Sequence, residues 1–127
     1  MDDRPDCGYC KVCTKRWAPA GLGSVLDIIS ALRRLTGRPN ASVPPGPGYC
    51  GRFACIGAAQ AWFCNDNDEE ITLDSWEVFA RAVEDIMRQC WWREKEGLHL
   101  TDLTGGQIFR PDGWNVIVLG GDDVCKS

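Results

Sequence analysis

The sequence has little of what catalysis, membrane insertion or nucleic-acid binding usually needs. It contains a single histidine, His99, whereas acid–base and nucleophilic catalysis most often use a histidine beside a carboxylate or a nucleophile. No apolar run approaches the roughly 20 residues that a membrane-spanning helix requires. The formal net charge is −4, and binding to phosphates depends on clustered lysines and arginines. We therefore predict no enzyme, no cofactor, no membrane span and no nucleic-acid partner.

Cysteine is the residue that the sequence has in excess. An even number in a short chain with 14 glycines and 7 prolines is typical of the disulfide framework of a secreted protein. A disulfide stabilises a small domain by about 2–4 kcal/mol. Eight cysteines allow about 105 pairings, so the connectivity stays open. We predict about four disulfides among Cys7, Cys10, Cys13, Cys50, Cys55, Cys64, Cys90 and Cys125.

The first ten residues are polar and acidic and lack the apolar segment of a signal peptide. Either a signal peptide has been removed, or the protein is cytosolic and its cysteines bind metal. The spread of cysteines along the chain favours the first interpretation, because disulfides persist in oxidising compartments. Asn40-Ala41-Ser42 is an N-glycosylation sequon, which makes Asn40 a candidate glycosylation site and agrees with secretion.

Two segments have the apolar periodicity of a helix. Residues 24–36 begin with Ser24 and Asp27 in a capping-box arrangement and precede Gly37, a common residue after a helix end. The apolar stripe of this helix consists of Val25, Ile28, Ile29, Leu32 and Leu35. Residues 74–92 begin with Asp74 and Glu77, and carry apolar residues at intervals of three and four.

The remaining pattern predicts strands. Residues 52–55 and 59–64 form two strands around a turn at Gly57, although a helix is possible in the alanine-rich part. Residues 107–110 and 114–118 form a hairpin around Pro111-Asp112-Gly113, a turn sequence. Residues 93–105 are charged and then glycine-rich, and predict a loop.

These elements predict one α+β domain over residues 1–127, with two helices packed on a small antiparallel sheet of four or five strands. Residues 1–20 form an irregular, disulfide-stapled arm, and residues 21–127 form the core. Cys55, Cys64, Cys90 and Cys125 are expected to lock the sheet to a helix, Cys90 through the second helix. The other cysteines are expected to hold the arm, and these are Cys7, Cys10, Cys13 and Cys50.

A tryptophan pair ends the second predicted helix. Adjacent helical residues point about 100° apart, so either Trp91 or Trp92 could pack in the core while the other is half exposed. Core packing is the more ordinary interpretation. An exposed tryptophan beside Arg93 and Lys95 would instead make a binding hot spot, and these four residues are the candidate binding surface.

Other polar clusters have ordinary explanations that we favour. The three cysteines at 7, 10 and 13 would need a distant fourth ligand to hold zinc, so disulfides are preferred and no metal site is predicted. Residues 65–70 are rich in oxygen ligands but lack the spacing of a calcium loop, which favours a solvated turn. Glu77, Glu84 and the pair Arg33-Arg34 are expected to be solvated surface.

The order of features from residue 50 to residue 125 resembles a known group. These features are CIGAAQAWFC at 55–64, NDN at 65–67, the helix ending at Cys90, Gly106-Gln107, and WNVIV at 114–118 before Cys125. The order is similar to small cysteine-rich secreted proteins of plant-associated fungi, many of which are candidate effectors. It more loosely resembles the killer-toxin-four fold group, in which two helices pack on an antiparallel sheet crossed by disulfides. The cysteines at 7, 10 and 13 depart from that pattern.

The resemblance implies a secreted protein that acts by binding a host or competitor target in the extracellular space, such as the plant apoplast. It transfers no catalytic residues. The leading hypothesis is therefore an effector or toxin-like monomer, recognised in one scenario by a plant immune receptor. Two alternatives stay open: a small secreted hydrolase using His99 with a carboxylate such as Asp102, and a cysteine-rich metal-binding module.

Overall fold

The computed structural model describes residues 11–13, 17–35, 42–44, 46, 48–121 and 125. Cys7, Cys10 and the sequon residue Asn40 lie outside these residues. The described chain forms β1 (Lys11–Cys13), β2 (Ala20–Gly21), α1 (Leu22–Arg33), β3 (Ser42–Val43), β4 (Tyr49–Ile56), β5 (Ala59–Asn65), β6 (Ile71–Thr72), α2 (Trp76–Gln89), β7 (Trp92–Glu96), β8 (His99–Thr104), β9 (Gly106–Arg110) and β10 (Trp114–Leu119).

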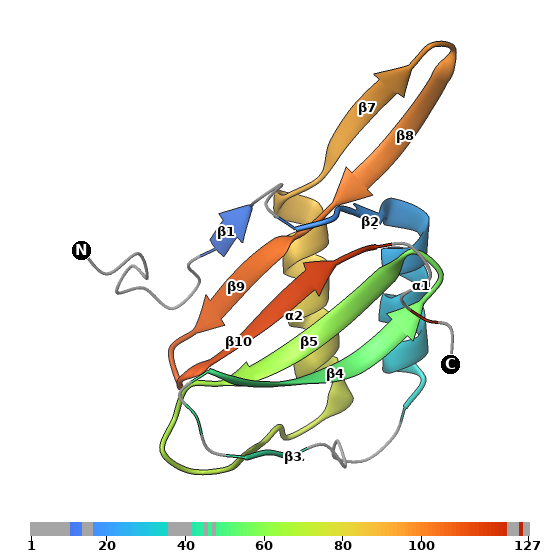
Figure 1. Cartoon of the computed structure of the whole chain (residues 1–127). Helices are drawn as coiled ribbons and strands as arrows, with labels where there is room; N and C mark the ends of the chain where they lie inside the picture. The colour runs from blue at the N-terminus through green and yellow to red at the C-terminus, as the bar shows by residue number, and fades with distance from the viewer. Residues whose placement is uncertain are drawn as a thin grey trace, which may run out of the picture.

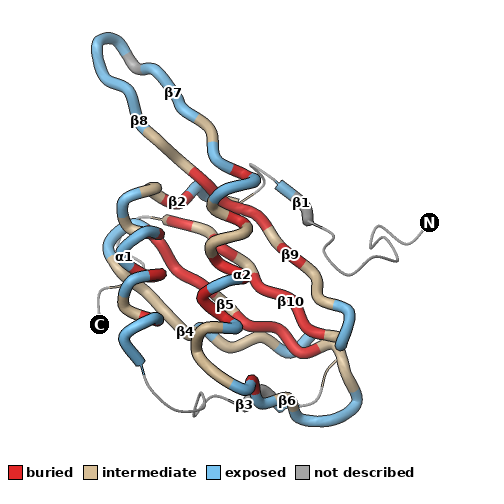
Figure 2. The backbone as a smooth tube through the Cα atoms, turned by 180° about the vertical axis from the view of Figure 1, so that it is seen from behind, coloured by how far each residue is buried: buried red, intermediate tan, exposed pale blue. Residues whose placement is uncertain are grey.

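An antiparallel sheet of five strands, in the order β1-β9-β10-β5-β4, forms the centre of the described fold. Both helices lie against one face of this sheet, as the two opposite views show (Figures 1 and 2). Strands β2, β8 and β7 make a second antiparallel sheet, and β3 pairs with β6. The predicted α+β arrangement is confirmed in outline, with more strands than the four or five expected.

Helix α1 buries the predicted stripe, but its ends differ from the prediction. Val25, Ile28, Ile29 and Leu32 are buried, whereas Leu35 lies beyond the last turn and is 49% exposed. The helix begins two residues earlier than expected, with Gly21 at the N-cap. Ser24 therefore caps nothing in its own helix. Its hydroxyl accepts a hydrogen bond of 3.1 Å from the backbone N–H of Ala58, and so connects α1 to the β4–β5 turn.

Helix α2 is the amphipathic helix that the periodicity predicts, but it is shorter. Its N-cap is Ser75 instead of Asp74, and it ends before Cys90. Trp92 belongs to the following strand and not to the helix. The buried face consists of Phe79, Ala80, Ala82, Val83 and Ile86.

The two predicted hairpins are both present. In β4–β5 the chain turns at Gly57, which has a positive φ of 56° that a side chain would disfavour. In β9–β10 it turns at Pro111-Asp112-Gly113, where Gly113 has a φ of 87°. The alanine-rich part of 59–64 is strand and not helix, and it pairs antiparallel with β4 on one side and with β10 on the other.

Two predictions of irregular structure are wrong. Within the expected arm, Lys11–Cys13 pairs with β9 as an edge strand. Residues 93–105 were expected to form a loop, but most of them belong to a regular hairpin of β7 and β8. This hairpin has few buried side chains. Its sequence therefore lacks the alternation of apolar and polar residues that predicts a strand.

Aromatic rings fill the space between the sheet and the helices. Phe63 on β5 is fully buried and stacks between Phe53 and Trp114, with ring centroids 5.1 and 5.3 Å away. Phe79 of α2 lies against the same group, 5.1 Å from Phe53 and 6.4 Å from Phe63. Because three rings contact Phe63, this residue connects the sheet to α2 at the centre of the core.

All six cysteines that the structure describes are in disulfides. The three bonds join Cys13 to Cys90, Cys50 to Cys64, and Cys55 to Cys125. The first connects β1 to the end of α2, so Cys90 does tie its helix to the sheet. Cys50 and Cys64 link two neighbouring strands; the expectations that Cys50 holds the arm and that Cys64 reaches a helix are wrong.

The cation Arg33 joins the two helices. Its Nε and Nη2 atoms donate to the carboxylate of Glu77 at 2.9 Å, and Nη2 also donates to Glu84 at 3.0 Å. The two glutamates lie two turns apart on α2, so one guanidinium from α1 spans both. These three side chains are at least partly exposed, as expected, but they also form one ion-pair cluster. The sequence does not show this cluster, because it does not show that α1 and α2 lie side by side.

This cluster predicts how stability depends on pH. Hydrogen bonds from Arg33 lower the pKa of both Glu77 and Glu84 below the ordinary value of 4.5. A carboxyl group with a lower pKa in the folded state stabilises the fold above its unfolded pKa, and that contribution is lost as the pH falls through the folded pKa. We expect E77Q/E84Q to show a smaller loss of stability than the wild type between about pH 6 and about pH 3 in urea unfolding.

The matched control is E70Q, which removes an exposed loop carboxylate. Its stability should fall with decreasing pH as steeply as that of the wild type. Parallel curves for the wild type and E77Q/E84Q would contradict the assignment of an acid-sensitive contact to Arg33.

Candidate functional site

The β7–β8 hairpin projects from the body of the protein, and from here on we call residues 92–104 the arm. This segment is separate from the N-terminal arm that was expected over residues 1–20. Both views show it extending beyond the sheet and the helices (Figures 1 and 2). Its strands pair from Trp92 with Leu103 to Glu96 with His99, and Gly97-Leu98 forms the two-residue turn. Gly97 has a φ of 60°, as the turns that suit the right-handed twist of such hairpins require.

Large apolar side chains are exposed along the arm. Leu98 at the tip is 99% exposed, Leu100 is 61% exposed, and Trp91 at the base is 49% exposed. An isolated exposed leucine is ordinary on a protein surface. Three such side chains on and at the base of one projecting hairpin are unusual and indicate an interaction surface, because the hairpin itself contributes little to the core.

The register divides the predicted binding surface between two faces of the arm. Arg93 lies opposite Asp102 and Lys95 lies opposite Leu100, so these side chains share a face with Trp91 two residues earlier. Trp92 and Glu94 point to the other face, where the indole Nε1 donates to the Glu94 carboxylate at 3.2 Å. The four residues of the predicted surface all lie in or beside β7, but they do not form one patch.

A compact charged group forms the base of the first face. Arg93 donates to the two oxygens of Asp102, from Nε at 2.6 Å and from Nη2 at 3.4 Å, and its guanidinium carbon lies 5.7 Å from the ring centroid of Trp91. Hydrogen bonds from Arg93 and, to a smaller extent, from Trp91 lower the pKa of Asp102. The carboxylate in turn raises the pKa of Arg93. These contacts hold Trp91 and Arg93 in one arrangement.

The hydrolase alternative depended on His99 acting with a carboxylate such as Asp102. The two residues are three positions apart on β8, so their side chains point to opposite faces of the hairpin. Asp102 is already engaged by Arg93. The structure therefore does not bring this pair together.

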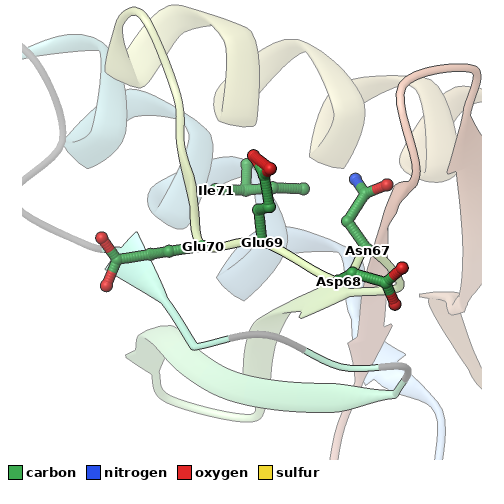
Figure 3. A pocket seen from close by; sticks show the side chains of 5 residues that line it. All are labelled: Asn67, Asp68, Glu69, Glu70 and Ile71. Atoms are coloured by element: carbon green, nitrogen blue, oxygen red, sulfur yellow. The ribbon is translucent and has the colours of Figure 1, made fainter.

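Four residues of the oxygen-rich loop 65–70 line a surface hollow of about 410 Å³ together with Ile71, and these four are residues 67–70. Asp68, Glu69 and Glu70 point in different directions from the backbone (Figure 3). In the part of the chain that the structure describes, no three potential ligand side chains gather around one point. The loop is instead organised by the buried side chain of Asn65, which donates to the carbonyl of Glu69 and accepts from the N–H of Asn67.

A second hollow, of about 310 Å³, lies on the sheet face opposite the helices. Its lining is mostly apolar and consists of Trp17, Cys50, Gln60, Trp62, Ile117 and Leu119. The Gln60 amide makes two hydrogen bonds here: it accepts from Trp62 Nε1 at 2.8 Å and donates to the Gly120 carbonyl at 3.2 Å. This hollow therefore offers apolar surface and no converging polar groups.

Comparison with known protein families, with curated proteins and with solved structures finds no match in any of the three. The resemblance to fungal secreted proteins thus stays a prediction. Among the described residues no helix is long and apolar enough to cross a membrane.

The residues at the end of the arm were not predicted from the sequence. Leu98 and Leu100 belonged to the expected loop, although Gly97 in a short stretch with tryptophan and threonine on either side is a hairpin signal. The signal was weak because the strands WREKE and HLTDLT are mainly polar.

Proposed function

We propose that the protein acts outside the cell by binding another protein, and that the arm makes the contact. The observation that carries the proposal is the exposure of Leu98 and Leu100 on a projecting hairpin and of Trp91 at its base. Exposed apolar side chains rimmed by charged residues are typical of recognition surfaces, and tryptophan and arginine are enriched among the residues that dominate binding energy.

The location outside the cell is supported by the disulfides. Bonds of this kind persist in oxidising compartments and are rare in the reducing cytosol. The resemblance of residues 50–125 to secreted proteins of plant-associated fungi supports a narrower proposal, namely an effector or toxin-like protein of the plant apoplast. On that proposal the partner is a host or competitor protein, such as a plant immune receptor.

The experiment compares the wild type with the double variant L98S/L100S on the arm. Each protein is immobilised and exposed to extracellular fluid from plant leaves, and the retained proteins are quantified by mass spectrometry. Because a hot-spot side chain contributes more than about 1 kcal/mol, we expect specific partners to bind L98S/L100S at least roughly tenfold more weakly.

The matched control is L26S/L35S, which changes two other exposed leucines. Leu26 is 46% exposed and lies in α1, and Leu35 is 49% exposed and lies just after it. This control should retain the same proteins as the wild type. Partners that bind all three proteins equally, or that are lost from both double variants, would contradict the proposal that the arm makes the contact.

A further inference from the structure

We propose that the outer edge of β7 binds an extended segment of the partner by strand addition, and that this segment carries acidic residues flanking a basic one. The inference rests on the proposed function in that it uses the same arm. It goes further because it names the part of the arm that binds and the chemistry of the segment that fits it. In strand addition the main chain supplies affinity and the alternating side chains supply specificity.

Among the edge strands that the structure describes, β7 is the one suited to this role. It is the last strand in the order β2-β8-β7 and lies on the projecting arm. The edge strand β4 is interrupted by a register shift between Arg52 and Ala54 and is crosslinked at Cys55 to Cys125. Such irregularities protect an edge from further pairing. The edge strand β1 has only three residues.

The register shows which backbone groups the edge offers. Glu96 and His99 flank a two-residue turn, and the pair next to such a turn exchanges hydrogen bonds between the strands. Because hydrogen-bonded and non-hydrogen-bonded pairs alternate along an antiparallel hairpin, Arg93 and Lys95 are in the second kind of pair. Their N–H and C=O groups therefore point away from β8, toward the open edge.

The side chains beside these groups determine which segment fits. Arg93 and Lys95 lie on one face of the hairpin and Glu94 lies on the other. An added strand places its own side chains directly beside them, and opposite charges in such positions are favourable. A segment that alternates acidic, basic and acidic residues is therefore complementary to Arg93, Glu94 and Lys95.

The same pattern disfavours a second copy of the chain as the occupant. Two identical edges that pair antiparallel about a two-fold axis bring residues of the same face together. If the two-fold axis passes at Glu94, Glu94 lies opposite Glu94 of the other copy and Arg93 lies opposite Lys95. If the axis passes at Arg93 or at Lys95, that cation lies opposite the same cation of the other copy. Like charges directly opposite are destabilising, so the edge resists self-association and selects a different strand.

The probes are two short synthetic peptides of equal length, with the core Glu-Lys-Glu or the reversed core Lys-Glu-Lys between threonine and valine residues. Each core reads the same in both directions, so the test does not depend on strand orientation. Binding to the whole protein is measured by chemical-shift titration of the backbone amides. We expect the Glu-Lys-Glu peptide to bind roughly tenfold more tightly, since three cross-strand charge pairs change sign between the probes.

Overall charge works against this expectation, which makes the result informative. The protein has a formal net charge of −4, so attraction by net charge alone favours the Lys-Glu-Lys peptide. Equal binding of the two peptides, stronger binding of the Lys-Glu-Lys peptide, or shifts confined to residues outside β7 would each overturn the inference.

Two variants and one control test the edge directly. K95P removes the outward N–H of residue 95 and should abolish peptide binding. It removes no hydrogen bond to β8, and proline is tolerated at such edge positions. The control K95T keeps the N–H and should bind the peptide within a few-fold of the wild type. E94K/K95E keeps the net charge and should reverse the preference between the two peptides. The amide spectrum of β8 shows whether the hairpin is intact in each variant.

The proposed function and this inference can fail separately. Partners lost from L98S/L100S but retained by K95P would keep the arm as the binding site and overturn strand addition. Partners lost from both variants, together with the peptide preference, would support both. Partners retained by both variants would overturn the proposed function and its use of the β7 edge.

Discussion

The variant C13A/C90A is expected to lose about 4.5 kcal/mol of unfolding free energy under non-reducing conditions. The two cysteines are 77 residues apart, so the bond removes a large amount of conformational freedom from the unfolded chain. The bond also attaches the short edge strand β1 to the C-cap of α2. Urea unfolding followed by far-ultraviolet circular dichroism measures the change.

The matched control for this prediction is C50A/C64A, which removes a bond across only 14 residues. Because the stabilisation grows with the logarithm of loop length, the control should lose about 3 kcal/mol, roughly 1.5 kcal/mol less than C13A/C90A. Each double variant removes both partners of one bond and leaves no new thiol. A larger loss in C50A/C64A would show that the local hairpin, and not the long-range crosslink, limits stability.

A second large effect is expected at the centre of the core, where F63A should lose about 3–5 kcal/mol. The Phe63 ring is fully buried between Phe53 and Trp114, and it also contacts Phe79 of α2. Alanine would leave a cavity between sheet and helix and would remove stacked pairs that contribute beyond buried area. Thermal or urea unfolding measures the change.

The conservative variant F63L keeps most of the volume and should lose clearly less than F63A. L100A removes an exposed leucine and should stay within about 0.5 kcal/mol of the wild type. A loss in F63A as small as that in L100A would contradict the placement of Phe63 at the centre of the core. Equal losses in F63A and F63L would indicate that ring stacking dominates over the filling of space.

The elements that could be predicted from the sequence are those in which local pattern and tertiary burial agree. The stripe of α1 from Val25 to Leu32 and the long amphipathic face of α2 are buried where their periodicity places them. The β9–β10 hairpin was predictable because Pro111-Asp112-Gly113 favours a turn whatever surrounds it. Helix ends were less predictable, because Ser24 uses its hydroxyl for a contact with Ala58 that lies far away in the sequence.

What could not be predicted depends on neighbours in space. Buried polar side chains are the clearest case: Asn115 donates to Asp66 at 2.7 Å and accepts from Gln107 at 2.8 Å, so one chain of hydrogen bonds crosses from the β5 loop to β9. No pattern in the sequence indicates that these three side chains meet. Arg33 between the two α2 glutamates is a second case, because its role exists only when the helices are packed.

The candidate site was found only in part. Trp91, Trp92, Arg93 and Lys95 do lie at the base and along one strand of the arm, but the sequence placed them at the end of a helix and in a loop. A helix would have turned successive side chains by about 100°, whereas the strand sends them to two opposite faces. The exposed leucines were missed for the same reason, since a loop gives no expectation of a face.

The positions of two crosslinks have a consequence for digestion of the chain by exopeptidases. Cys13 lies near one end of the sequence and Cys125 near the other, and each is bonded to a cysteine well inside the fold. An enzyme that removes residues one at a time from either end meets a covalent branch before it reaches α1 or β10. Trimming of the native protein should therefore not pass these two residues, while the same chain after reduction should be degraded much further.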